Sequence, residues 1–182
     1  MRRMALRRIG LLAAVVAAVL AVVAVLATGL GRDPSAPTSP LVGRAAPAFT
    51  LAQLNGPPFA LANVRGQVVV INFWASWCAE CHTEQAALNA TWQQFRDAGV
   101  VVLGVNFQDT SSEARDYVRT AGVSYPVVED ADSRAALAYG LRGIPETFIV
   151  DRSGRVADRI IGPVDAARLA SRITSLLPAG RR

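Results

Sequence analysis

The first feature of the hydrophobic pattern is an uncharged run from Ile9 to Leu30, which is 22 residues long. A helix needs about 20 apolar residues to span a bilayer, whereas the apolar core of a secretion signal has only about 7 to 15. Four arginines precede the run and one follows it, which favours a cytoplasmic N-terminus. We therefore expect a retained single-pass anchor in the cell membrane, with cleavage near Ala27 or Gly29 as the alternative.

The stretch after this run is dominated by Pro, Ser and Ala and has no periodicity. Such a composition is typical of a semi-extended linker. The expected organisation is a cytoplasmic basic tail at residues 1–8, a transmembrane signal-anchor at 9–30, a linker at 31–40, a folded domain at 41–178 and a short tail at 179–182. The folded domain is expected outside the membrane, on the periplasmic side.

The folded domain opens with an alternation of strand and helix patterns. Gln67 to Ala75 and Val100 to Phe107 are nearly continuous β-rich apolar runs, typical of strands covered on both faces. Between them, apolar residues recur at helical spacing until about Ala98. A strand, a helix and a second strand in this order predict a parallel pair.

The elements that follow are shorter. We expect a helix capped by Ser111 or Ser112 and ending near Ala121, a short segment from Tyr125 to Val128, a short helix from Ser133 to Tyr139, strands from Thr147 to Asp151 and from Val156 to Ile161, and a helix from Asp165 to about Leu177. The turn Arg152-Ser153-Gly154 joins the two strands as an antiparallel hairpin. The fold class is therefore α/β, with a central mixed sheet flanked by helices.

The charge balance of the folded domain mainly argues against one class of partner. From Leu41 onward the chain has 14 arginines and 13 acidic residues, so the folded domain is nearly neutral. Nucleic-acid binding needs clustered cations, and we expect no nucleic-acid partner. The default expectation for the oligomeric state is a monomer.

The chemistry is concentrated in WCAECHTE, which holds the chain's only two cysteines, Cys78 and Cys81, and its only histidine, His82. Cys78 lies where a buried strand ends and a helix begins, and a helix N-terminus stabilises a thiolate. A disulfide to Cys81 closes a ring too small to add much stability. The pair therefore suits exchange, in which Cys78 attacks a partner disulfide and Cys81 resolves the mixed disulfide.

Two acidic residues accompany the dithiol. Negative charge at Glu80 and Glu84 opposes ionisation of a nearby thiol, which favours a reductant over an oxidant. Glu84 lies three residues after Cys81, on the same helical face, where it can accept the proton of Cys81. The alternative for both acids is an exposed position in the first helical turn, favoured by the helix dipole.

Ile144 and Pro145 directly precede a predicted strand. An X-Pro bond is where a cis peptide costs little, and a cis proline opposite the dithiol would expose the Ile144 backbone to an extended substrate segment. An ordinary proline that leads a strand is the simpler interpretation of the local sequence.

The same five residues, CAECH, also match the site of covalent haem attachment in c-type cytochromes. A haem attached at this motif usually has Met or a second His as its other axial ligand. The only methionines here are Met1 and Met4, and there is no second histidine. A zinc site on Cys78, Cys81 and His82 lacks a fourth ligand. We expect no metal and no cofactor, and an inert structural disulfide also remains open.

Two longer motifs carry a family resemblance. WCxxCxxE spans Trp77 to Glu84 and GxPETFxxDxxG spans Gly143 to Gly154, with APAFTL and GVNFQD in support. Over about residues 41–178 the chain resembles membrane-anchored thioredoxin-fold thiol–disulfide oxidoreductases of the TlpA/ResA/CcmG (DsbE) type. The PETF motif is closest to the cytochrome c maturation branch.

The resemblance implies a thioredoxin-like fold and a set of site residues. Pro145 would be the family's cis proline, Trp77 would flank the dithiol, and Glu84 would be the family's acid after the second cysteine. Glu146 would lie near the active site and be linked to partner recognition. Asn72 stands where ordinary thioredoxins carry a buried Asp.

The resemblance also implies a function, namely reduction of the CxxCH disulfide of apocytochrome c so that haem can be ligated. Electrons would arrive from a DsbD- or CcdA-like membrane thiol carrier. Two positions depart from the family pattern. Glu80 stands where Pro or another neutral residue is common and bears on the redox potential, and Gln85 stands where Pro is frequent.

Three other functions compete with this one. A broader extracytoplasmic thiol reductase or an oxidant would use the same dithiol, although an oxidant needs a strongly depressed Cys78 pKa. Peroxiredoxins share the fold, but their catalytic cysteine follows a threonine by three residues, and that position is Ala75 here. A haem or metal carrier would use Cys78, Cys81 and His82 as ligands.

Overall fold

The computed structural model describes residues 14–24 and 39–178, which belong to two units, Met1–Pro37 and Thr38–Arg182. In the first unit, residues 14–24 form a helix. Among the described residues, no helix is long and apolar enough to cross a membrane. The expected basic tail, most of the expected linker, the expected C-terminal tail and both ends of the expected anchor lie outside the described residues.

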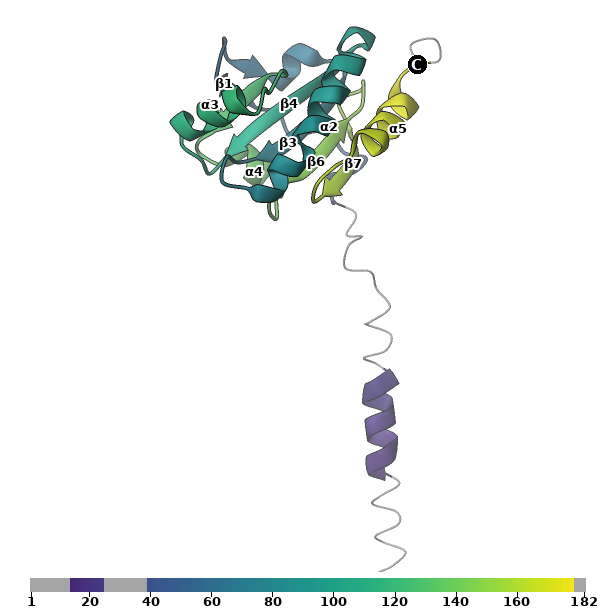
Figure 1. The fold of residues 1–182 in the computed structure, drawn as a ribbon. Coiled ribbons are helices and arrows are strands. Elements are labelled where there is room, and N and C mark those ends of the chain that lie inside the picture. The colour runs from purple at the N-terminus through teal and green to yellow at the C-terminus, as the bar shows by residue number, and fades with distance from the viewer. Residues whose placement is uncertain (1–13, 25–38, 179–182) are drawn as a thin grey trace, which may run out of the picture. The chain divides into compact units, whose positions relative to one another are not determined.

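The second unit is built on one mixed sheet (Figure 1). Its strands are β1 Thr50–Gln53, β2 Phe59–Ala60, β3 Val68–Trp74, β4 Val100–Phe107, β5 Val127–Asp130, β6 Glu146–Val150 and β7 Val156–Ile161. Their order across the sheet is β2-β1-β5-β4-β3-β6-β7. β3, β4 and β5 are parallel, and the remaining pairs are antiparallel. The predicted parallel pair and the predicted hairpin of β6 and β7 are both confirmed.

Four helices accompany this sheet: α2 Ala79–Phe95, α3 Ser111–Thr120, α4 Arg134–Ala138 and α5 Ala166–Leu176. Single 3-10 turns occupy Leu61–Val64 and Arg96–Ala98. In Figure 1, α2 lies across the central strands, with α3 and α5 on either side of it. The dithiol segment therefore connects the end of β3 to the start of the long helix α2.

All seven residues of β3 are buried, because both faces of this strand are covered. Val68, Val70 and Trp74 pack in a cluster with apolar side chains of α2, α3 and α5. Val69 and its alternate neighbours pack in a second cluster with α4 and with residues 41–64. Asn72 is the one polar residue of the strand and is 1% exposed, so its side chain needs partners inside the protein.

One expected helix cap is wrong. Thr110 caps α3, instead of Ser111 or Ser112: its side-chain oxygen accepts a hydrogen bond from the Glu113 amide at 3.3 Å and donates to the Glu113 carboxylate at 2.7 Å. The first of these bonds satisfies a free amide at the helix start, and the second holds the Thr110 side chain against Glu113. The expected cap of α5 is confirmed, since Asp165 accepts from the Arg168 amide at 2.8 Å.

Strands β1 and β2 were not expected from the sequence. They have four and two residues, and neither contains a buried residue. They pair with each other, and β1 also pairs with β5. Their hydrogen bonds thus extend the sheet without a long apolar run that would mark them in the sequence.

Candidate active site

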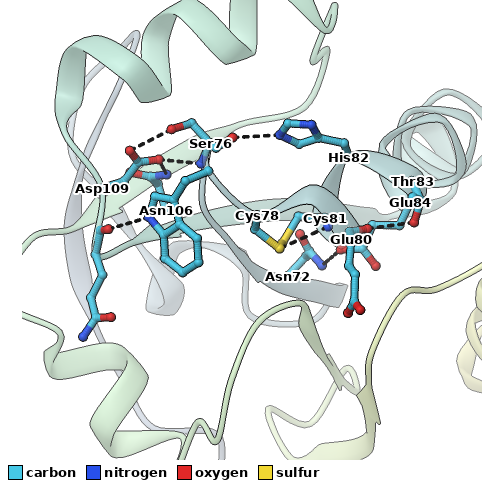
Figure 2. Close-up of a disulfide and its surroundings, with 12 residues drawn as sticks. Asn72, Ser76, Cys78, Glu80, Cys81, His82, Thr83, Glu84, Asn106 and Asp109 are labelled. Atoms are coloured by element: carbon cyan, nitrogen blue, oxygen red, sulfur yellow. Dashed lines mark hydrogen bonds between the residues drawn. A yellow bond between two sulfur atoms is a disulfide. The ribbon is translucent and has the colours of Figure 1, made fainter.

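Cys78 lies at the N-terminus of α2, as the sequence predicted. Its amide donates to Ala75 O at 3.2 Å, and its sulfur accepts from the Cys81 amide at 3.1 Å. Cys78 and Cys81 are joined by a disulfide, with a Cα–Cα distance of 5.3 Å. The exposed fractions are 6% for Cys78 and 3% for Cys81. The sulfur of Cys78 therefore caps α2 by accepting a hydrogen bond from the Cys81 amide (Figure 2).

Glu84 is not an exposed acid of the first helical turn, so that alternative is wrong for this residue. Its side chain is 1% exposed. One carboxylate oxygen accepts from Asn72 Nδ2 at 2.7 Å, and the other accepts from the Val164 amide at 2.9 Å. Asn72 Nδ2 also donates to Thr147 Oγ1 at 3.1 Å. The carboxyl group thus joins α2 to β3 and to the loop before α5.

Burial raises the pKa of Glu84 to about 7, although hydrogen bonds from Asn72 and Val164 act in the opposite direction. A buried carboxyl favours its neutral form because the charged form loses hydration. Glu84 and Cys81 both belong to the buried side of α2. A group that titrates near neutrality one turn after Cys81 is suited to exchange a proton during thiol chemistry.

Glu80 is different, because its side chain is exposed. Its contact within the protein is through the backbone, where its carbonyl accepts from Thr83 Oγ1 at 2.7 Å. For Glu80, the alternative of an exposed acid in the first helical turn, favoured by the helix dipole, therefore describes the structure.

The Ile144–Pro145 peptide bond is cis, as the family resemblance implies. Pro145 directly precedes β6, whose first residue, Glu146, is opposite Phe73 near the end of β3. The proline is therefore at the same end of the sheet as the dithiol turn. Pro145 O accepts from the Gly162 amide at 3.0 Å, which ties it to the segment after β7.

Glu146 lies at the expected end of the sheet, but its side chain is 0% exposed. It forms an ion pair with Arg159 at 2.6 Å, and the Arg159 side chain is 3% exposed. Burial raises the pKa of Glu146, while Arg159 and Arg142 act to lower it. The carboxylate therefore does not reach the surface, where a partner would bind.

Trp77 is 60% exposed and directly precedes Cys78. Its indole Nε1 donates to Gln108 O at 2.8 Å. Beside it, the Ser76 amide donates to Asp109 Oδ2 at 2.6 Å (Figure 2). The contribution of Gln108 and Asp109 was not anticipated. The sequence signal that could have revealed them was their position directly after β4. The carboxyl ends of parallel strands meet at one edge of a sheet, so residues after β4 lie beside the residues after β3.

The side chains that a haem or metal site would require make other contacts. The two sulfurs are bonded to each other, and His82 Nε2 is 2.8 Å from Ser76 O. Among residues 14–24 and 39–178, no group of three or more His, Cys, Asp or Glu side chains is arranged to hold a metal ion. The contacts of Cys78, Cys81 and His82 favour the dithiol interpretation over the ligand interpretation.

A redox-active pair at the start of α2, a cis proline at the neighbouring strand end and a mixed sheet with parallel centre define a thioredoxin-like thiol:disulfide oxidoreductase. Residues 42–159 match the AhpC/TSA family. The chain belongs to this family, within its group of thiol:disulfide oxidoreductases.

Two curated relatives support this assignment. The chain is 40% identical over 161 residues to the thiol:disulfide interchange protein DsbE of Allochromatium vinosum, with 87% of each chain covered. It is 37% identical over 149 residues to the thiol:disulfide interchange protein HelX of Rhodobacter capsulatus, with 80% of this chain and 82% of the relative covered.

A solved structure agrees with these sequence relationships. A thiol:disulfide interchange protein of the thioredoxin family from Chlorobium tepidum superposes with a TM-score of 0.68 and is 29% identical. The match covers 74% of this chain and 96% of the other chain. The expected thioredoxin-like fold is confirmed.

Proposed function

We propose that this protein reduces disulfides outside the cytoplasm and that its substrate is the CxxCH cysteine pair of apocytochrome c. Cys78 is the attacking cysteine, Cys81 is the resolving cysteine and Glu84 is the proton acceptor. The 40% and 37% identities to the thiol:disulfide interchange proteins DsbE and HelX support this proposed activity. The expected anchor at residues 9–30 would hold the domain at the outer face of the membrane.

The reaction transfers two electrons to the substrate. The Cys78 thiolate attacks one sulfur of the substrate disulfide, forms a mixed disulfide and releases the second substrate sulfur as a thiolate, which takes a proton from solvent. Cys81 then loses its proton to Glu84 and attacks the Cys78 sulfur, which releases the first substrate sulfur as a thiolate that takes a proton from solvent. The protein is left with the Cys78–Cys81 disulfide, and a DsbD- or CcdA-like membrane dithiol supplies two electrons to reopen it.

The observation that carries this proposal is the buried Glu84 carboxyl, whose pKa is raised to about 7. At neutral pH a substantial fraction of this group is ionised and able to take a proton. Its negative charge near the dithiol also opposes thiolate formation, which favours the disulfide product and hence a reductant. The same charge weighs against the oxidant alternative, which needs a stabilised Cys78 thiolate.

Substrate choice is tested with the full-length chain in detergent micelles, reduced and then mixed with a peptide whose CxxCH cysteines form a disulfide. Tryptophan fluorescence follows oxidation of the dithiol, and the control peptide carries Ser in place of His. We expect the CxxCH peptide to react faster. Equal rates would indicate the broader reductase, and a lack of reaction with either peptide would contradict the proposal.

The net direction is tested by equilibrating the same protein in glutathione or dithiothreitol buffers. A reduction potential near or below roughly −200 mV supports an electron donor, whereas a value near about −120 mV identifies an oxidant. Haem staining after denaturing electrophoresis of membranes tests the carrier alternative, which a covalent haem band would support.

A further inference from the structure

Ser76, two residues before the attacking cysteine, is held at three of its atoms (Figure 2). Its amide donates to Asp109 Oδ2 at 2.6 Å and its hydroxyl donates to Asp109 Oδ1 at 2.9 Å. Its carbonyl oxygen lies 2.8 Å from His82 Nε2. The turn that enters Cys78 is therefore held from the loop after β4 on one side and from α2 on the other.

In the hydrogen bond between His82 and Ser76, the donor and the acceptor can be assigned. A carbonyl oxygen only accepts hydrogen bonds, so Nε2 carries the hydrogen. This bond exists in the neutral tautomer with a proton on Nε2 and in the imidazolium form alike. The ring also stacks on Tyr117 of α3, with 4.5 Å between ring centroids and 20° between the ring planes. An exposed side chain is thus held in one orientation by two contacts.

Asp109 holds its side of the turn through several donors. Besides Ser76, Asn106 Nδ2 donates to Oδ2 at 2.8 Å and the Thr110 amide donates to Oδ1 at 2.9 Å. Burial alone would raise the pKa of Asp109, but these hydrogen bonds outweigh it and keep the pKa below its ordinary value. The carboxylate therefore stays charged and accepting at the pH where the dithiol works.

We propose that His82 and Asp109 are positioning residues that keep Cys78 in place when the disulfide is open. In the closed form, the covalent bond to Cys81 restrains the Cys78 sulfur. In the reduced form, the sulfur is stabilised by the Cys81 amide and the N-terminus of α2 only while the turn from Ser76 to Cys78 keeps its position. The hydrogen bonds to Ser76 supply this restraint without touching the sulfur.

This inference rests on the proposed function, since it assigns the two residues to the same reaction. It predicts that loosening the hold on Ser76 raises the pKa of the reduced Cys78 thiol and slows its reactions near neutral pH. His82→Leu removes the donor, whereas His82→Gln retains an N–H group where Nε2 lies. Both variants lack the ionisable ring, so the comparison between them isolates the hydrogen bond from charge.

The test is the pH dependence of Cys78 alkylation by iodoacetamide, measured on the reduced full-length chain in micelles. We expect His82→Leu to slow alkylation at pH 7 on the order of 5-fold, as for one lost hydrogen bond, and to raise the apparent Cys78 pKa. His82→Gln should recover most of the rate. The melting temperatures of the two variants should agree, which separates positioning from loss of fold.

Asp109→Asn provides an independent arm. The amide replaces an accepting oxygen with a donor that faces the donors of Ser76 or Asn106, which releases the turn and raises the Cys78 pKa. Loss of the Asp109 charge acts in the opposite direction, and we expect release of the turn to dominate, so that the net Cys78 pKa is higher. Combined with His82→Leu, it should have less than an additive effect, because both changes release the same turn. Equal alkylation rates in the His82→Leu and His82→Gln variants, or an unchanged Cys78 pKa in every variant, overturn the inference.

The outcomes also separate this inference from the proposed function. Alkylation needs no protein substrate, so it reports on Cys78 even if apocytochrome c is not reduced. If the wild-type chain reduces disulfides but the His82 and Asp109 variants leave the alkylation rate and pKa of Cys78 unchanged, the positioning role alone is contradicted. A chain whose Cys78 pKa responds to these variants but which reduces no disulfide contradicts the proposed function alone.

Discussion

Glu146 and Arg159 form an ion pair at 2.6 Å with both side chains almost wholly shielded from solvent. Arg159 also donates to Gly140 O at 3.3 Å and lies over the ring of Phe148, 5.4 Å from its centroid. Glu146 comes directly after the cis Pro145. The pair therefore connects β6, β7 and the loop that leads to the proline.

Breaking this pair from one side should be strongly destabilising. Arg159→Met leaves the Glu146 carboxylate buried without its partner, and we expect a loss of about 3 to 5 kcal/mol in the free energy of unfolding. Adding Glu146→Gln to Arg159→Met removes the stranded charge and should recover much of this loss. Urea denaturation of the oxidised protein at pH 7 measures both effects.

A more exposed ion pair between β7 and α5 serves as the control. Arg172 Nε lies 2.6 Å from Asp158 Oδ2, and the exposed fractions of their side chains are 47% and 25%. Because exposed pairs contribute little, Arg172→Met should cost within about 1 kcal/mol. A cost for Arg159→Met no larger than that for Arg172→Met would contradict the buried role.

The stability of the protein should depend on pH through Glu84. Its pKa is about 7 in the folded protein and 4.5 when unperturbed, so the folded state binds the proton more tightly. Stability from this group is complete below about pH 4.5, falls as pH rises towards 7 and stays lost above that. The shift corresponds to about 3 kcal/mol.

Glu84→Gln removes this dependence because its amide does not titrate. The difference in unfolding free energy between the variant and the wild type should therefore grow in favour of the variant as the pH rises from about 4.5 to about 8. Glu80→Gln, which removes an exposed carboxylate from the same helix, provides the matched control for the loss of one negative charge. Parallel profiles for wild type and Glu84→Gln would show that burial does not raise this pKa.

Glu84 should also affect one step of the reaction more than the other. A mixed disulfide between Cys78 and a chromogenic thiol releases that thiol when Cys81 attacks, so its absorbance reports the second step alone. We expect Glu84→Gln to slow this release at pH 7 on the order of 10²-fold, the usual lower contribution of a general base. The first attack by Cys78 should change much less, and an equal slowing of both steps would exclude the proton-acceptor role.

Gly104 of β4 should not tolerate a side chain. A Cβ atom there would lie 2.9 Å from Trp74 Nε1 and 3.2 Å from Tyr125 Cε2. Gly104→Ala should therefore cost about 1 to 3 kcal/mol through overpacking and alter tryptophan fluorescence. Gly143→Ala is the control, because a Cβ at Gly143 meets nothing within 4 Å, and a similar cost for both changes would argue against overpacking.

Much of the fold was accessible from local patterns. The buried runs of β3 and β4 and the helix between them were predicted within a few residues, because strands covered on both faces leave continuous apolar stretches. The two short edge strands, β1 and β2, left no comparable signal. Their place depends on the pairing of β1 with β5, which comes much later in the chain.

The sequence by itself determined the redox pair, its place at a helix start and the family to which the chain belongs, since these follow from short motifs and their spacing. Only the tertiary structure decided that Glu84 is buried against Asn72 and Val164, and that Glu146 faces Arg159 inside the protein. Burial and partner choice arise from residues far apart in the chain, and the pKa of a carboxyl group depends on those surroundings.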